Sequence, residues 1–112
     1  MRLDKDLRSI QEVRDLLAKA RGAQRVLAGM SQEELDKITA AVSRAGAAEA
    51  GRLARMAVEE TGYGRAEDKE IKNRFAAVDL YQAIRDQRTH GLLARDDERR
   101  TMDIGVPVVV GA

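Results

Sequence analysis

The sequence predicts an α/β fold in which a mostly helical N-terminal part leads into a β-hairpin and then into a single apolar strand. Apolar residues recur at helical spacing through most of the first 88 positions. Polar and apolar residues then alternate around an acidic turn, and a valine-rich run follows. We therefore divide the chain into a helical segment over residues 1–88, a hairpin over residues 89–105 and a strand over residues 106–112.

The first helix is expected to begin at Ser9, because Glu12 follows three positions later and completes a capping box. Gly29 is a plausible C-terminal stop, and Gly22 weakens the middle of the helix. The apolar residues that share one face of this helix are Ile10, Val13, Leu16, Leu17, Ala20, Val26 and Leu27.

A second helix is expected after Ser31, the N-cap of another capping box with Glu34. Gly46 and Gly51 predict a soft joint, after which a further helical stretch ends at residues 61–62. The apolar residues of the two stretches are Leu35, Ile38, Ala41, Val42 and Ala45, then Leu53, Met56, Ala57 and Val58.

A turn over residues 63–65 precedes the last helix, whose first turn is expected to hold Glu67 and Asp68 because the helix dipole favours negative charge there. The side that we expect to be buried carries Ile71, Phe75, Val78, Leu80, Tyr81 and Ile84.

The valine run is typical of a strand buried on both faces of a parallel sheet, with Pro107 at its start. Such a strand needs neighbouring strands and covering helices. Either another chain supplies them or, as we favour, the sequence is the front piece of a longer protein.

The composition excludes several classes of protein. With 20 basic and 19 acidic residues, the net charge of +1 argues against a nucleic-acid binder and a polybasic membrane-surface protein. No stretch reaches the roughly 20 apolar residues that span a bilayer, and no secretory signal opens the chain. There is no cysteine, so the chain itself has neither a disulfide nor a thiolate nucleophile. A cytoplasmic protein is expected.

The candidate chemical groups each have a simpler interpretation. His90 is a conceivable general base, but it precedes Gly91 and is better explained as a turn or surface residue. Asp96, Asp97 and Glu98 carry the carboxylates that bind cations, yet a solvated hairpin turn fits them better.

The glutamate pair and two glycines near the second helix end are explained in the same way. Glu59 and Glu60 are adjacent, so on a helix they point about 100° apart, which is unsuited to paired acid–base work. Gly62 and Gly64 follow a helix C-terminus, the wrong end of the dipole for a phosphate. We therefore assign no catalytic, cofactor-binding or metal-binding residue.

Residues 56–65, Met-Ala-Val-Glu-Glu-Thr-Gly-Tyr-Gly-Arg, together with 67–69 and 71–73, resemble the CoA-acylating aldehyde dehydrogenases. Residues 9–16 and 30–33 are similar to helix starts of the same family, and 89–91 with 104–108 to its hairpin and following strand. The resemblance is closest to the acetaldehyde/propionaldehyde type, which includes enzymes of bacterial microcompartments and fusions to alcohol dehydrogenase.

The resemblance implies an aldehyde dehydrogenase-like fold, with residues 106–112 as the first strand of a Rossmann-like, nucleotide-binding sheet. It implies oxidation of a short aldehyde with NAD and transfer of the acyl group from a cysteine thiolate to coenzyme A. It further implies a homo-oligomer with the hairpin at the subunit interface.

This chain departs from the family pattern, because it has neither a cysteine nor a G-x-G-x-x-G motif. We expect an N-terminal fragment, either a natural truncation or a frame-disrupted product, that is inactive alone and binds no cofactor. The alternative is a non-enzymatic helical protein-interaction module.

The N-terminal helix also permits two interpretations. Leu3, Leu7, Ile10, Val13 and Leu17 form an apolar stripe, and short helices of this kind act as packing signals for microcompartment shell proteins. No linker separates this helix from the next, so core packing is the favoured prediction, and localisation inside a microcompartment is the alternative.

Overall fold

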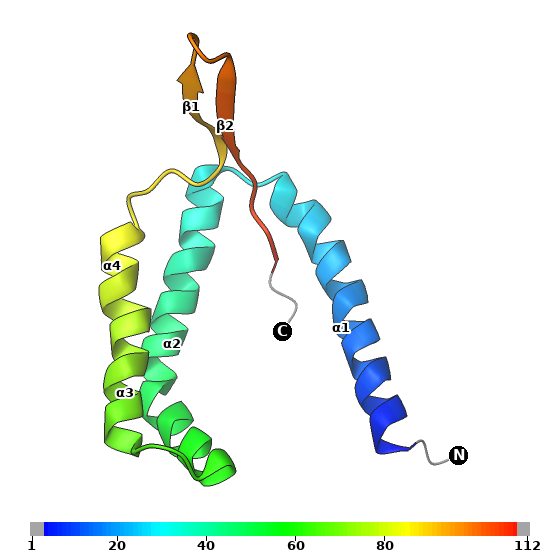
Figure 1. Cartoon of the computed structure of the whole chain (residues 1–112), viewed down its shortest axis with the longest axis vertical. Coiled ribbons are helices and arrows are strands. Elements are labelled where there is room, and N and C mark those ends of the chain that lie inside the picture. The colour runs from blue at the N-terminus through cyan, green and yellow to red at the C-terminus, as the bar shows by residue number, and fades with distance from the viewer. Residues whose placement is uncertain (1–3, 110–112) are drawn as a thin grey trace. The chain divides into compact units, whose positions relative to one another are not determined.

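The structure is a computed structural model that describes residues 4–109. The described residues form two compact units, one made of residues 4–32 and 88–109 and the other of residues 33–87 (Figure 1). No helix in this part of the chain is both long enough and apolar enough to cross a bilayer. The predicted order of helices followed by a hairpin is confirmed.

In the first unit, α1 runs from Lys5 to Ala28, so the predicted start at Ser9 is wrong. The Ser9 hydroxyl donates to the carbonyl of Lys5, one turn earlier, at 3.1 Å. Serine makes this bond readily inside a helix, so its presence did not mark a cap. The predicted end is confirmed, because Gly29 is the C-cap and its N–H donates to the Val26 carbonyl.

The predicted core packing of the α1 stripe is wrong for this chain. No residue of α1 is buried, and the apolar side chains of its central turns keep about half of their surface exposed. Periodicity identified a helix face correctly but not what covers it. Leu3 lies outside the described residues. The exposed members are Leu7, Ile10, Val13 and Leu17.

The predicted hairpin is confirmed. Strands β1 (Gly91–Asp96) and β2 (Thr101–Gly105) pair antiparallel, with Gly91 opposite Gly105 and a bulge between Leu92 and Ala94. The bulge inserts one extra residue into β1, which locally increases strand twist.

The side chain of Gln32, which belongs to the same compact unit, holds the base of the hairpin. The Gln32 Oε1 atom accepts the N–H groups of Thr89 (2.8 Å) and His90 (2.9 Å), while its Nε2 donates to the Thr89 hydroxyl (3.0 Å). A Cβ placed on Gly105 would lie 2.1 Å from the Thr89 carbonyl oxygen, so only glycine fits there.

The described part of the predicted C-terminal strand, residues 106–109, has no strand pairing. Val106 and Val108 are 65% and 73% exposed, and the strand buried within a larger sheet stays a prediction. Residues 110–112 of the predicted strand lie outside the described residues.

In the second unit, α2 is one continuous helix, Gln32–Thr61, so the predicted joint at Gly46 and Gly51 is wrong. Its start directly after Ser31 and its end at Thr61 agree with the sequence prediction. Gly62, with a φ of 69°, follows the helix, and its N–H donates to the Val58 carbonyl at 2.8 Å.

The return segment is helical over its whole length and lies antiparallel beside α2 (Figure 1). It consists of α3 (Ala66–Arg74), a π-helical segment η1 (Phe75–Asp79) and α4 (Leu80–Ile84). The predicted buried side is wrong except at Tyr81: Ile71 and Phe75, for example, are 68% and 62% exposed. The less exposed positions are Ala66, Lys69, Glu70, Asn73, Ala77 and Tyr81, a face rotated from the predicted one.

Candidate functional site

The return segment packs closely against α2 along a seam, which we define by Gly46, Ala50, Gly51 and Ala54 of α2. Ala50 and Ala54 have 0% and 1% of their surface exposed. A Cβ on Gly46 would lie 3.3 Å from the Ala77 Cβ, and one on Gly51 would lie 3.1 Å from a carboxylate oxygen of Glu70. These two glycines therefore allow close helix packing, which explains why they do not interrupt α2.

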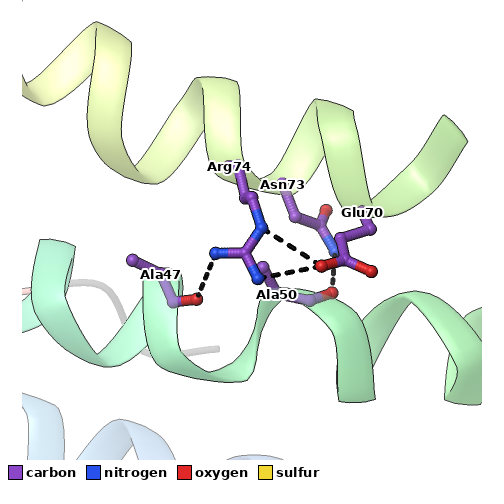
Figure 2. Close-up of polar contacts among 5 residues, drawn as sticks. All are labelled: Ala47, Ala50, Glu70, Asn73 and Arg74. Atoms are coloured by element: carbon purple, nitrogen blue, oxygen red, sulfur yellow. Dashed lines mark hydrogen bonds and ion pairs between the residues drawn. The ribbon is translucent and has the colours of Figure 1, made fainter. Parts of the chain in front are cut away.

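Polar side chains of α3 fasten this seam to the backbone of α2 (Figure 2). The Asn73 amide donates to the Ala50 carbonyl at 3.1 Å, and Arg74 reaches the Ala47 carbonyl at 3.4 Å. Arg74 also donates from Nε (3.1 Å) and Nη2 (2.8 Å) to one oxygen of Glu70. Because carbonyl oxygens have two lone pairs, α2 accepts these bonds without losing its own.

A hydrogen bond from Ser43 of α2 links the π-helical segment η1 to that helix. The Leu80 N–H donates to the Phe75 carbonyl, a spacing of five residues, and the Ser43 hydroxyl donates to the Ala77 carbonyl at 2.6 Å. A π-bulge displaces carbonyls from the regular ladder, and such bulges are frequent at functional sites. No sequence signal predicted this segment.

A groove of about 560 Å³ runs along the seam within this unit. Its walls are mainly apolar, with Lys69 and Lys72 as its charged residues. No aspartate, glutamate or histidine lines it, and its titratable side chains are Lys69, Lys72 and Tyr81. The α2 wall consists of Thr39, Val42, Ser43, Gly46, Leu53 and Ala57.

His90 lies in a bend directly before β1, as the sequence predicted. Its backbone N–H is held by Gln32, and its Nδ1 atom is buried without a hydrogen-bond partner among the described residues. The imidazole is thus part of the hairpin base.

The acidic residues after β1 form the hairpin turn, as predicted. Asp96 Oδ1 accepts the N–H groups of Glu98 and Arg99, both at 3.0 Å, and Asp97 accepts from Arg95 Nε at 2.6 Å. Within residues 4–109, no three His, Cys, Asp or Glu side chains gather as a metal site.

The remaining candidates also keep their simpler interpretation. Glu59 and Glu60 are exposed in the last turns of α2. Gly62 and Gly64 have φ values of 69° and 76°, a conformation that glycine adopts without strain. Both belong to the turn between α2 and α3.

The described helix starts are unsuited to the phosphates of NAD or coenzyme A. A phosphate binds where backbone N–H groups and the positive end of the dipole are free of negative charge. The first turns of α1, α2 and α3 carry Asp6, Glu33 with Glu34, and Glu67 with Asp68. The negative charge at these three helix starts therefore disfavours a phosphate there.

Known proteins are similar to this chain in both fold and sequence. The crystal structure of an acetylating aldehyde dehydrogenase from Geobacillus thermoglucosidasius matches with a TM-score of 0.81 and 53% identity, covering 90% of this chain and 22% of that one. The bifunctional aldehyde-alcohol dehydrogenase AdhE of Escherichia coli K12 is 41% identical over 100 residues, which are 89% of this chain and 11% of that protein.

A third relative is the succinate-semialdehyde dehydrogenase (acetylating) of Clostridium kluyveri, 32% identical over 85% of this chain and 21% of its own length. No protein-family model matches the chain. The fold of the chain is thus that of the matched segment of aldehyde dehydrogenases. More specifically, the chain is a homologue of the acylating aldehyde dehydrogenases, which confirms the resemblance, and it spans between a tenth and a quarter of the length of these relatives.

Sequence reasoning missed the residues that hold each unit together. Gly46 and Gly51 are five positions apart with Ala50 and Ala54 nearby, and small residues spaced along one helix could have signalled close packing. Gln24 and Gln32, whose amides bind backbone of the other end of the chain, carry no local signal because their partners are distant in sequence.

Proposed function

We propose that this chain forms the N-terminal segment of an NAD-dependent, CoA-acylating aldehyde dehydrogenase that converts a short aldehyde to its acyl-CoA. The observation that carries the proposal is the likeness to the Geobacillus acetylating enzyme, 53% identical over 90% of the chain at a TM-score of 0.81.

The segment serves the reaction as scaffold. The proposed chemistry needs a thiolate that attacks the aldehyde carbonyl and later leaves as CoA displaces it. The 112 residues contain no cysteine, and none of the described helix starts suits a phosphate. The chain alone is therefore inactive, and the nucleophile and cofactor contacts come from elsewhere in the enzyme.

The hairpin is proposed to join a subunit interface of a homo-oligomer. A two-stranded hairpin is marginally stable in water unless further strands or a helix cover it. Leu92, Met102 and Ile104 are 46%, 61% and 63% exposed, which supports a partner surface against β1 and β2. A cytoplasmic enzyme is proposed, and association with a microcompartment shell stays a prediction from the α1 stripe.

A chimeric enzyme tests the proposal. Residues 1–112 replace the matched segment of the Geobacillus enzyme, and NADH formation from acetaldehyde is measured with and without CoA. We expect activity that depends on both CoA and NAD, within about tenfold of the parent, because packing conserved in volume and pattern costs little.

The 112-residue chain assayed alone is the matched control and is expected to form no NADH. A chimera that folds and assembles like the parent but lacks activity would contradict the proposal. So would activity of the isolated chain. The helical interaction module predicts a folded chain that does not replace the dehydrogenase segment.

A further inference from the structure

The side chain of Gln24 in α1 makes two hydrogen bonds to the backbone after the hairpin. Its Nε2 donates to the Pro107 carbonyl at 2.7 Å, and its Oε1 accepts the Val109 N–H at 2.8 Å. These atoms come from positions more than 80 residues apart in the sequence and belong to the same compact unit. One carboxamide thus satisfies both a donor and an acceptor.

This pattern is that of a parallel β-bridge centred on Val108. In a parallel pair, one residue donates to the carbonyl of position i−1 and accepts the N–H of position i+1. A glutamine carboxamide has the same N–H and C=O groups as a peptide unit. Gln24 therefore occupies the place that a neighbouring strand would take beside residues 107–109.

The two edges of this segment consequently differ. In extended backbone, successive residues direct their polar groups to opposite edges of the strand. The Pro107 carbonyl and the Val109 N–H both bind Gln24, so in an extended segment the N–H and C=O of Val108 belong to the opposite edge. Val108 is 73% exposed. Among residues 4–109, no hydrogen bond to the Val108 backbone is present.

We propose that Gln24 is a positioning residue that closes one edge of residues 107–109 and thereby directs strand pairing to the edge of Val108. The occupant of that edge is a β-strand of the same dehydrogenase, a point that rests on the proposed function. The assignment of Gln24 itself does not depend on that function. Val106 and Val108 are exposed and contribute little apolar contact. Among the described residues, the Gln24 carboxamide therefore holds this segment through its two hydrogen bonds.

Amide hydrogen exchange, followed by NMR on the full 112-residue chain, tests the assignment. Val108 and Val109 are adjacent and identical in side chain, so their protection factors compare directly. We expect the Val109 amide to be at least about fivefold better protected than that of Val108, the effect of one net hydrogen bond of about 1 kcal/mol.

Variants separate positioning from general packing. Gln24→Met keeps the length of the side chain but removes both bonds, so the Val109 protection should fall to that of Val108. Gln24→Glu keeps an acceptor for the Val109 N–H, so protection should be retained while the Pro107 carbonyl loses its donor. Gln11→Met is the control, because the Gln11 amide binds Asp15 within the same helix at 2.8 Å.

Cross-strand contacts between Gly91 and Gly105 report whether each variant keeps its hairpin. Equal protection of Val108 and Val109 in the parent chain would overturn the assignment, as would a Gln24→Met chain that keeps the Val109 protection. If Gln24→Met also loses the hairpin, Gln24→Glu decides: loss of Val109 protection with an intact hairpin refutes the bridge.

The pairing edge is tested in the chimeric enzyme, where the Val108 amide should become protected by the neighbouring strand. An active chimera with an unprotected Val108 would refute the edge assignment while leaving the proposed function intact. An inactive chimera, with Val109 still protected in the isolated chain, would refute the proposed function alone.

Discussion

In the helical unit, α2 and the return segment meet through glycine and alanine, whereas in the other unit two glutamine side chains hold the hairpin base and the segment after it. The first contact is a surface of small atoms, with Ala50 fully buried. The second is a set of directional bonds from Gln24 and Gln32 to backbone groups. The seam should therefore fail when volume is added, and the glutamine contacts should fail when polar groups are removed.

The largest effect is expected from adding volume to the seam. Ala50→Leu inserts three carbons where no surface is exposed, and overpacking of this kind costs about 1–3 kcal/mol. Thermal unfolding followed by circular dichroism measures the loss. Ala48→Leu is the matched control, because Ala48 is exposed on the same helix and should tolerate the change. Equal losses from both variants would contradict a close-packed seam.

A smaller loss is expected at the hairpin base. Gly105→Ala puts a Cβ 2.1 Å from the Thr89 carbonyl oxygen, so the backbone has to move and the bonds from Gln32 lengthen, at a cost of about 1–2 kcal/mol. Loss of the Gly91–Gly105 pairing in NMR spectra is the readout.

The control for Gly105→Ala is a glycine substitution away from the hairpin base, for which the expected change in stability has the opposite sign. Gly22 lies in α1 with nothing within 4 Å of an added Cβ, so Gly22→Ala should stabilise the helix by about 0.5–1 kcal/mol. A Gly105→Ala chain as stable as the parent would show that the base is not closely packed.

The smallest change concerns the polar part of the seam. Asn73→Ala removes one bond to a carbonyl of α2 that still has its helical partner, so about 1 kcal/mol is expected. Urea denaturation measures the difference, with the exposed Lys72→Ala as control. A loss as large as that of Ala50→Leu would mean that polar bonds, rather than small volume, dominate the seam.

Elements with a local cause were predictable. Gly29 ended α1 and Thr61–Gly62 ended α2 where the sequence placed them, and the alternation around Asp96 to Glu98 gave the hairpin. Each of these depends on contacts within a few residues. The likeness to acylating aldehyde dehydrogenases was also predictable from the resemblance of residues 56–65, and relatives 41% and 53% identical to the chain confirm it.

Burial was not predictable in the same way. The apolar faces of α1 and of the return helix exist as expected, yet Ile10 and Phe75 remain exposed within this chain. Helical spacing states which residues share a face, but only a partner at van der Waals distance decides whether that face is covered. For the same reason, the sequence predicts a joint at Gly46 and Gly51, although these glycines allow the return segment to pack closely against α2.

The sequence alone determined the C-terminal ends of α1 and α2, the hairpin turn, the lack of a cysteine in this chain and the likeness to acylating aldehyde dehydrogenases, because each is a property of residue identity at short spacing. Only the tertiary structure decided which face of each helix has a neighbour, that η1 is a π-helix, and that Gln24 takes the place of a strand. These features depend on groups far apart along the chain, and local pattern does not encode the distances between them.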